Sequence, residues 1–266
     1  MHIADESRGV GGALRAHWRA VLGELVATAL LVLLGVASCV PALKVTTDGD
    51  ETLAAPPLPI IALAFGFVVV CLIQVFGDIS GAHMNPAVTL ASAILCRTPL
   101  ALAAAYVVAQ VAGATLGFAA LQALTPWKIM ELSPAMGVTL PARGVGDLAA
   151  VGVEAALTGL LALLACSLWT RPHCNSNPIK FGLTIAGLVC AGGELTGASL
   201  NPARSFGPAL LMSKWDSHWV YWAGPLLGAA LCTLLHRWVL APDAHVRPQR
   251  ATTAPEDLPL NDKTNC

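Results

Sequence analysis

Residues 84–88 read MNPAV, and residues 200–204 read LNPAR. An Asn-Pro pair is typical of a helix start, because Asn caps the free N–H groups of the first turn and Pro occupies the first helical position without losing a hydrogen bond. Each copy follows a Gly-containing turn and precedes about ten residues of apolar sequence. Ten helical residues rise about 15 Å, half of a hydrocarbon core. Each copy therefore predicts a half-helix that begins at the middle of a membrane.

The composition indicates a membrane protein. Of the 266 residues, 56% are hydrophobic and only 12% are charged, with a mean hydropathy of +0.68, which is more apolar surface than a soluble domain can bury. The formal net charge of -1 and the lack of a basic stripe with aromatic residues argue against a nucleic-acid partner. Most of the eight cysteines lie in apolar runs without metal-ligand spacing, so we interpret them as reduced thiols and expect no metal and no cofactor.

Six apolar runs are long enough to cross a hydrocarbon core, which takes about 20 helical residues. They cover residues 18–40, 58–76, 99–124, 147–170, 178–194 and 218–240. The two Asn-Pro segments lie between the second and third runs and between the fifth and sixth. The sequence thus predicts an all-α membrane protein with six transmembrane helices and two half-helices. This domain spans residues 18–241, between an N-terminal tail (1–17) and a polar, disordered C-terminal tail (242–266).

The two halves of the chain resemble each other. The matched elements are SGAHMNPAVTL (80–90) with TGASLNPARSF (196–206), Glu24 and Thr28 with Glu154 and Thr158, and Tyr106 and Gly113 with Tyr221 and Gly228. Because each half has three spans, the second copy enters the membrane from the opposite side, which predicts an inverted-topology repeat. Of the 15 Lys and Arg residues, ten fall on the side of both termini, which predicts that the termini are cytoplasmic.

An inverted repeat brings the two Asn-Pro helix starts together near the membrane midplane. Each start presents the positive end of a helix dipole and an amide side chain, that of Asn85 or Asn201. The turns before them, which contain Gly81 and Gly197, offer backbone carbonyls as acceptors, and irregular backbone at this depth must line a wet cavity or be buried in protein. Such a centre favours a neutral, hydrogen-bonding solute and repels cations and protons.

These motifs, together with the Gly224-Pro225 pair that opens the sixth span, resemble the aquaporin (major intrinsic protein) family over residues 18–240. The resemblance implies a bundle of six tilted helices and two half-helices in the plasma membrane, assembled as a homotetramer with one pore in each subunit. It implies a passive channel and not an enzyme, with water and small neutral solutes as its partners. The pore motifs are then Asn85, Pro86 and Ala87, and Asn201, Pro202 and Ala203.

By the same resemblance, the selectivity constriction consists of Phe65, Val189, Ala198 and Arg204. A charge such as that of Arg204 costs on the order of 2.5–3.5 kcal/mol inside a membrane and therefore needs a role. Water-selective members usually carry His where this chain has Val189. We therefore expect a wider and less polar filter, which passes glycerol or urea as well as water.

The sequence around the second motif instead follows the water-type pattern. Ser205 stands where glycerol-facilitating members of the older branch usually have Asp, and Ala209 and the Tyr221-Trp222 pair are also water-type. A water-type scaffold that lacks the constriction His resembles the glycerol-permeable channels of insects. A strictly water-selective channel remains the alternative.

Three further polar residues lie within the predicted membrane region. For Glu24 and Glu154 we favour a structural role, as acceptors of hydrogen bonds from loop N–H groups, over direct contact with solute. His83 either lines the pore, where its protonation would gate flux, or forms a plain loop hydrogen bond; both interpretations stay open.

Two other classes of function fit the sequence less well. An intramembrane enzyme is disfavoured, because the sequence has no nucleophile motif, metal-ligand spacing or cofactor fingerprint. A structural or adhesive membrane protein with little flux is compatible with the scaffold, but the intact Asn85, Asn201 and Arg204 weigh against it.

Overall fold

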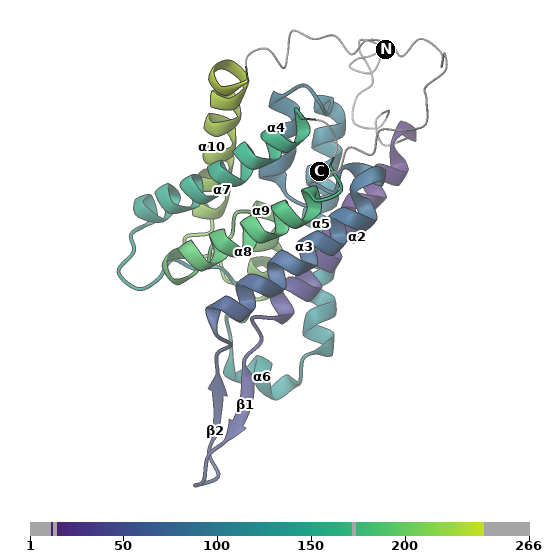
Figure 1. Ribbon diagram of the computed structural model, residues 1–266. Helices are drawn as coiled ribbons and strands as arrows, with labels where there is room; N and C mark the ends of the chain where they lie inside the picture. The colour runs from purple at the N-terminus through teal and green to yellow at the C-terminus, as the bar shows by residue number, and fades with distance from the viewer. Residues whose placement is uncertain (1–11, 13–14, 172–173, 242–266) are drawn as a thin grey trace, which may run out of the picture.

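The computed structural model describes residue 12 and residues 15–171 and 174–241. Within these residues, six helices are long and apolar enough to cross a membrane. They are α2 (Trp18–Ala37), α3 (Leu58–Ser80), α5 (Leu100–Leu124), α7 (Asp147–Trp169), α8 (Asn177–Thr196) and α10 (Val220–Leu235), which a π-helical turn, η1 (His236–Leu240), extends. The short helices α4 (Pro86–Ile94) and α9 (Pro202–Leu211) are the expected half-helices (Figure 1). The predicted fold class is confirmed. The predicted tail 242–266 and most of the tail 1–17 lie outside the described residues.

Two spans end later than their apolar runs indicated. Helix α3 continues through Gly77, Asp78 and Ile79 to Ser80, and α8 continues to Thr196. Each stops at a glycine in the left-handed conformation, Gly81 with φ 88° and Gly197 with φ 80°, whose N–H closes the last turn. Glycine adopts this conformation without the steric cost that a side chain brings. The boundaries are thus set by the C-caps and not by the loss of hydrophobicity.

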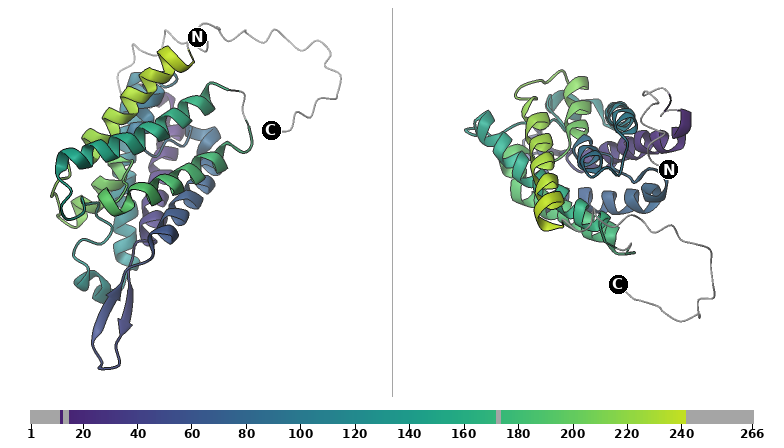
Figure 2. Two further views of the ribbon diagram at one scale, coloured as in Figure 1. Left: turned by 60° about the vertical axis from the view of Figure 1, so that its left-hand side comes forward. Right: turned by 90° about the horizontal axis from the view of Figure 1, so that it is seen from above.

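The long helices pack in matched pairs, α2 with α5 and α7 with α10, while α3 packs with α8. Both matched pairs have a glycine at the contact. A Cβ at Gly113 would lie 2.2 Å from the Leu25 carbonyl oxygen, and a Cβ at Gly228 would lie 2.0 Å from the Ala155 carbonyl oxygen. Small residues allow such close approach of helices in membranes. The equivalent contacts in the two halves agree with an inverted repeat, and the long helices cross at an angle (Figure 2).

The two ends of the bundle differ. Helix α2 begins and η1 ends at one of them, here called the terminal face, and a β-hairpin projects from the other, the hairpin face (Figure 1). The hairpin pairs β1 (Ala42–Val45) with β2 (Glu51–Ala54), with Ala42 opposite Ala54. The all-helical prediction did not include it. Its strands carry Val and Thr and flank an Asp-Gly turn, which favours a hairpin.

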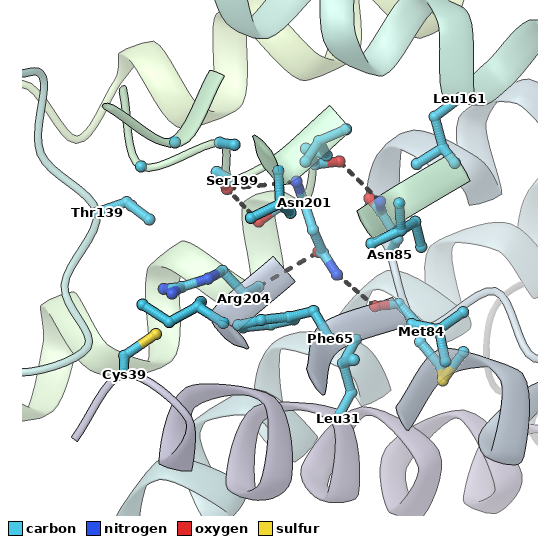
Figure 3. A pocket seen from close by; sticks show the side chains of 18 of the residues that line it. Leu31, Cys39, Phe65, Met84, Asn85, Thr139, Leu161, Ser199, Asn201 and Arg204 are labelled. Carbon is cyan, nitrogen blue, oxygen red and sulfur yellow. Dashed lines mark hydrogen bonds between the residues drawn. The ribbon is translucent and has the colours of Figure 1, made fainter. Parts of the chain in front are cut away.

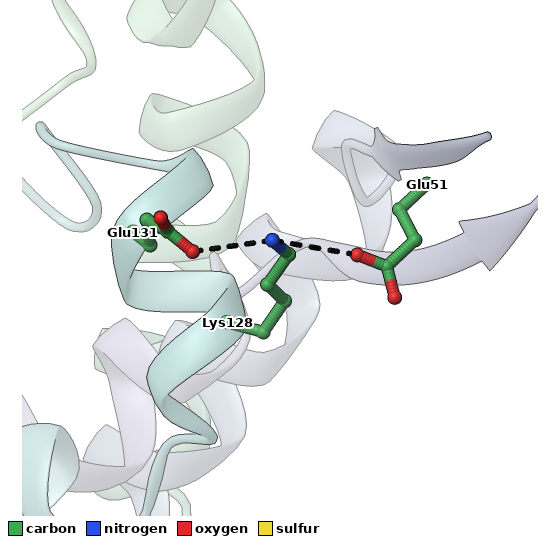
Figure 4. A network of polar contacts seen from close by, with 3 residues as sticks. All are labelled: Glu51, Lys128 and Glu131. Atoms are coloured by element: carbon green, nitrogen blue, oxygen red, sulfur yellow. Dashed lines mark hydrogen bonds and ion pairs between the residues drawn. The ribbon is translucent and has the colours of Figure 1, made fainter.

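One exposed ion-pair network joins this hairpin to α6 (Trp127–Leu132). The Lys128 ammonium lies 3.2 Å from Glu131 Oε2 and 3.5 Å from Glu51 Oε2 (Figure 4). The pKa of Lys128 is raised above its usual value, first by the hydrogen bond and charge of Glu131 and then by Glu51. Because solvent screens such pairs, the network orients the hairpin but contributes little to stability.

The glycine contact predicts the effect of a single methyl group. We expect Gly228→Ala to lower the stability by at least about 1–3 kcal/mol, because the methyl overlaps backbone that must then shift. Gly152→Ala is the matched control in α7, since a Cβ there would meet no atom within 4 Å. Thermal unfolding in detergent, followed by loss of the monodisperse peak, measures both variants. Equal midpoints for the two variants would contradict the close α7–α10 contact.

Candidate pore site

Two Asn side chains cap the half-helices. Asn85 Oδ1 accepts a hydrogen bond from the Ala87 N–H at 2.8 Å. Asn201 Oδ1 accepts from the N–H groups of Ala203 and Arg204, at 3.0 and 3.3 Å. Both Asn residues have extended backbone, as an N-cap requires. The helix starts predicted from the sequence are therefore present, with Pro86 and Pro202 in the first turn.

The same two amides hold the half-helices together. Asn85 Nδ2 donates to the Leu200 carbonyl at 2.8 Å, and Asn201 Nδ2 donates to the Met84 carbonyl at 2.7 Å (Figure 3). Each amide nitrogen carries a second N–H, and both Asn side chains line one cavity. The two helix N-termini thus meet, and their amides offer donors to a solute in the cavity.

The loops that lead to the two Asn residues share an unusual backbone. Ala82 and Met84 have φ angles of 48° and 52°, and their counterparts Ala198 and Leu200 have 42° and 54°. Left-handed backbone at a residue with a side chain costs on the order of 1–3 kcal/mol. Four such residues at matched positions need compensating interactions, which two buried carboxylates provide.

The Glu24 carboxylate, fully buried, holds the first loop. Its Oε1 accepts from Ser80 Oγ at 2.7 Å and from the His83 N–H at 2.8 Å, and its Oε2 accepts from the Met84 N–H at 2.7 Å. A fourth donor, Gln110 Nε2, lies 2.8 Å from Oε2. These bonds satisfy loop N–H groups that no helix could satisfy at this depth.

Glu154 does the same for the second loop. Its Oε1 accepts from Thr196 Oγ1 at 2.7 Å and from the Ser199 N–H at 2.9 Å, and its Oε2 accepts from the Leu200 N–H at 2.9 Å. This carboxylate is also fully buried. Neither Glu24 nor Glu154 lines the central cavity, so the geometry supports loop fixation and not solute contact.

Two tyrosines at matched positions in the two halves anchor the loop entrances. The hydroxyl of Tyr106 donates to the Ser80 carbonyl at 2.9 Å, and that of Tyr221 donates to the Thr196 carbonyl at 2.8 Å. Gln110 was missed altogether, although a Gln within an apolar span is a signal for a buried polar contact.

The central cavity has a volume of about 210 Å³. All four residues of the expected constriction line it, together with both Asn side chains; these four are Phe65, Val189, Ala198 and Arg204. Most of the other lining side chains are aliphatic, and Gly197 contributes backbone. The cavity therefore combines an apolar wall with a few fixed polar groups. Ala87 and Ala203 are buried but do not line it, and Gly81 lies in a separate opening of about 420 Å³ that includes Arg97.

Arg204 is 6% exposed, and a carbonyl and an aromatic ring lie against its guanidinium. Its Nη1 donates to the Gly137 carbonyl at 2.6 Å, and its guanidinium carbon lies 5.5 Å from the centre of the Phe65 ring, a cation–π distance. The carbonyl and the ring fix the guanidinium in the cavity wall. Gly137 lies in the segment between α6 and α7, and nothing in the sequence indicated this contact.

His83 combines both of the arrangements left open by the sequence. Its Nδ1 lies 3.2 Å from Thr89 Oγ1, and the residue also lines the cavity. Its ring packs against Tyr106 and Trp169, with centroid distances of 5.5 and 5.7 Å. The imidazole is thus held by a loop hydrogen bond while it contributes to the wall.

The carboxylate contacts predict a loss of stability on neutralisation. We expect Glu154→Gln to lower the thermal midpoint and the permeability of the protein, because an amide N–H₂ replaces one acceptor oxygen and faces a loop N–H. Each charge-assisted hydrogen bond contributes about 1.5–3 kcal/mol. Glu194→Gln, at an exposed site on α8, makes the same chemical change as a control. A midpoint for Glu154→Gln equal to that of the control would argue against the clamp.

Comparisons with known proteins agree with this geometry. The family model described as Major intrinsic protein matches residues 13–236. The chain is 37% identical over 244 residues to Aquaporin-6 of Rattus norvegicus, covering 91% of this chain and 83% of the relative. It is 40% identical over 221 residues to Aquaporin TIP4-4 of Zea mays, covering 82% of this chain and 85% of the relative.

A solved structure has the same fold. It is described as the aquaglyceroporin from Plasmodium falciparum, and it superposes with a TM-score of 0.75 and 22% identity over 87% of this chain and all of that chain. The family model covers most of the sequence, and the inverted repeat, the two half-helices and the capped Asn pair account for the match in structural terms. The chain belongs to the major intrinsic protein family, the aquaporins, and is a multi-pass membrane protein.

Proposed function

We propose that this protein is a passive channel that conducts water and also glycerol or another small neutral solute such as urea, and that it excludes ions and protons. The observation that carries the proposal is the central cavity, in which two Asn amides meet beside an otherwise largely apolar wall that includes Val189. Members of this family are channels and not enzymes, which supports passive flux.

The lining suits a polyol as well as water. A polyol needs donors and acceptors for its hydroxyl groups and an apolar surface for its carbon chain. The Asn amides and the fixed Arg204 guanidinium supply donors, and the Phe65 ring and Val189 supply apolar surface. We assign Phe65, Val189, Ala198 and Arg204 to the selectivity constriction on this basis.

Exclusion of cations follows from charge placement. Two half-helices direct the positive ends of their dipoles to the centre, and Arg204 adds a full charge nearby. A cation that loses its hydration shell in the cavity finds no carboxylate to bind there, because Glu24 and Glu154 accept hydrogen bonds from the loops. A water that accepts from the Asn amides is oriented by them, which interrupts a proton-conducting chain.

The relatives bear on selectivity only through their names. Two matched relatives are named as aquaporins, and the Plasmodium falciparum structure is described as an aquaglyceroporin; at 22% identity the latter supports the fold alone. We extend the proposal to a homotetramer in the plasma membrane with cytoplasmic termini, and to a channel domain of residues 18–241.

A strictly water-selective channel is the second candidate. The water-type residue Ser205 is part of the second loop's hydrogen-bond network, since its Oγ lies 2.6 Å from Ser199 Oγ and 2.7 Å from Thr139 Oγ1. A low-flux structural or adhesive protein is the third candidate, and a direct flux measurement separates it from both channels.

The two channel candidates differ in the effect of Val189. We expect purified protein in vesicles to shrink rapidly in a sucrose gradient and to re-swell rapidly in a glycerol gradient, as measured by stopped-flow light scattering. Val189→His should reduce glycerol permeability on the order of tenfold, the size of effect that one misfitting group has in a tight apolar pocket, and should leave most water flux. Val189→Thr conserves the size of the side chain and adds a hydroxyl, so it should retain glycerol flux if width is limiting.

Each outcome selects one candidate. Water flux without glycerol flux in the wild type would establish the strictly selective channel and overturn the assignment of Val189 as the widening residue. Flux no higher than that of protein-free vesicles would support the structural protein.

A further inference from the structure

The first span contributes a face to the pore that the sequence did not indicate. Leu31, Gly35 and Cys39 are spaced four residues apart and therefore lie on one side of α2 and its final turn. Leu31 and Cys39 both line the central cavity. Between them, Gly35 faces Phe65, because a Cβ at position 35 would lie 2.6 Å from Phe65 Cε1. The missing side chain lets α2 lie directly against the ring at the constriction.

The end of α2 then fixes the position of Cys39. The N–H groups of Ser38, Cys39 and Val40 bond the carbonyls three residues earlier, with the Cys39 N–H 2.9 Å from the Val36 oxygen. Ser38 Oγ adds a bond of 2.6 Å to the Gly35 carbonyl. These contacts tighten the last turn, so the backbone sets the direction of the Cys39 Cα–Cβ bond.

The thiol of Cys39 points into the cavity toward Arg204, near the Phe65 ring (Figure 3). Thr139 lines the same cavity. Among the described residues that line this cavity, Cys39 is the only cysteine. A thiol is small and only weakly polar, so this side of the wall leaves room beside the strong donors of the guanidinium.

We propose that Cys39 is a specificity-determining residue of the channel, forming a fifth side of the constriction at the level of Arg204. The inference rests on the proposed conduction of water and a small neutral solute. A larger side chain at position 39 should narrow the passage beside the guanidinium. Because glycerol is larger than water, its permeability should fall more than that of water.

Substitutions that change the size of the side chain at position 39 test this role. We expect Cys39→Leu to reduce glycerol permeability several-fold more than water permeability in the same stopped-flow assay, and Cys39→Ser, which keeps the size of the side chain, to change the ratio of the two permeabilities much less. Cys190→Leu is the matched control, because Cys190 lies exposed on α8 and does not line the cavity. Size-exclusion profiles and thermal midpoints show whether each variant is folded. If folded Cys39→Leu passes glycerol and water at wild-type rates, the inference is wrong.

Thiol modification tests the same position without a mutation of the filter. A charged methanethiosulfonate transfers its thioalkyl group to the Cys39 thiolate, forming a disulfide and releasing methanesulfinate. We expect this reagent to reduce the water permeability of the wild type and of Cys190→Ser, but not of Cys39→Ser, and dithiothreitol to restore it. Equal inhibition of wild type and Cys39→Ser would overturn the inference. If the wild type conducts but neither Cys39 test gives the expected result, the proposed channel function stands and the role of Cys39 is wrong. If the wild type shows no flux, both the channel function and the role of Cys39 are wrong.

Discussion

Two loops carry backbone to the membrane midplane, where water cannot satisfy every N–H, and the carboxylates of Glu24 and Glu154 accept hydrogen bonds from that backbone. Without these acceptors, each loop would leave at least two buried N–H groups unpaired, at about 1–3 kcal/mol each. It would also have to hold its left-handed residues unaided. The half-helices, the capped Asn pair and the cavity all depend on loops held in this way.

The carboxylates reach the loops only because the long helices pack closely. Glu24 and Glu154 lie in α2 and α7, and each of these helices contacts its partner through a glycine, Gly113 or Gly228. Since lipid supplies no hydrophobic driving force between helices, close packing of small residues must hold the bundle. Helix spacing, carboxylate reach and loop position are therefore coupled, and a methyl group at a helix contact should disturb a loop that it never touches.

Local signals in the sequence predicted most of this architecture. Asn85-Pro86 and Asn201-Pro202 predicted the half-helices because N-capping is a local interaction, and the span count followed from hydrophobic length. The sequence did not predict the roles of Cys39, Gly137 and Gln110, because these roles arise from contacts between segments far apart in the chain. Gly137 bonds a side chain 67 residues away, and Gln110 bonds one 86 residues away. The β-hairpin was not predicted for another reason: its Asp-Gly turn is a local signal, but its strands are short and exposed and therefore add nothing to the hydrophobic pattern that identifies membrane spans.

The inverted repeat makes the centre of the pore nearly symmetric, and the residues proposed to select solutes lie where the symmetry breaks. Three residues after Asn201 stands Arg204, whereas three residues after Asn85 stands Val88, and both line the cavity. His83 similarly corresponds to Ser199, and Gln110 to Pro225. A symmetric pair of amides can orient a neutral solute but offers no difference between its two sides. The single guanidinium, held by the Gly137 carbonyl and the Phe65 ring, places the charge on the half toward the hairpin face. We therefore expect residues that surround this one group, Cys39 among them, to influence which solute passes more than residues at the symmetric centre do.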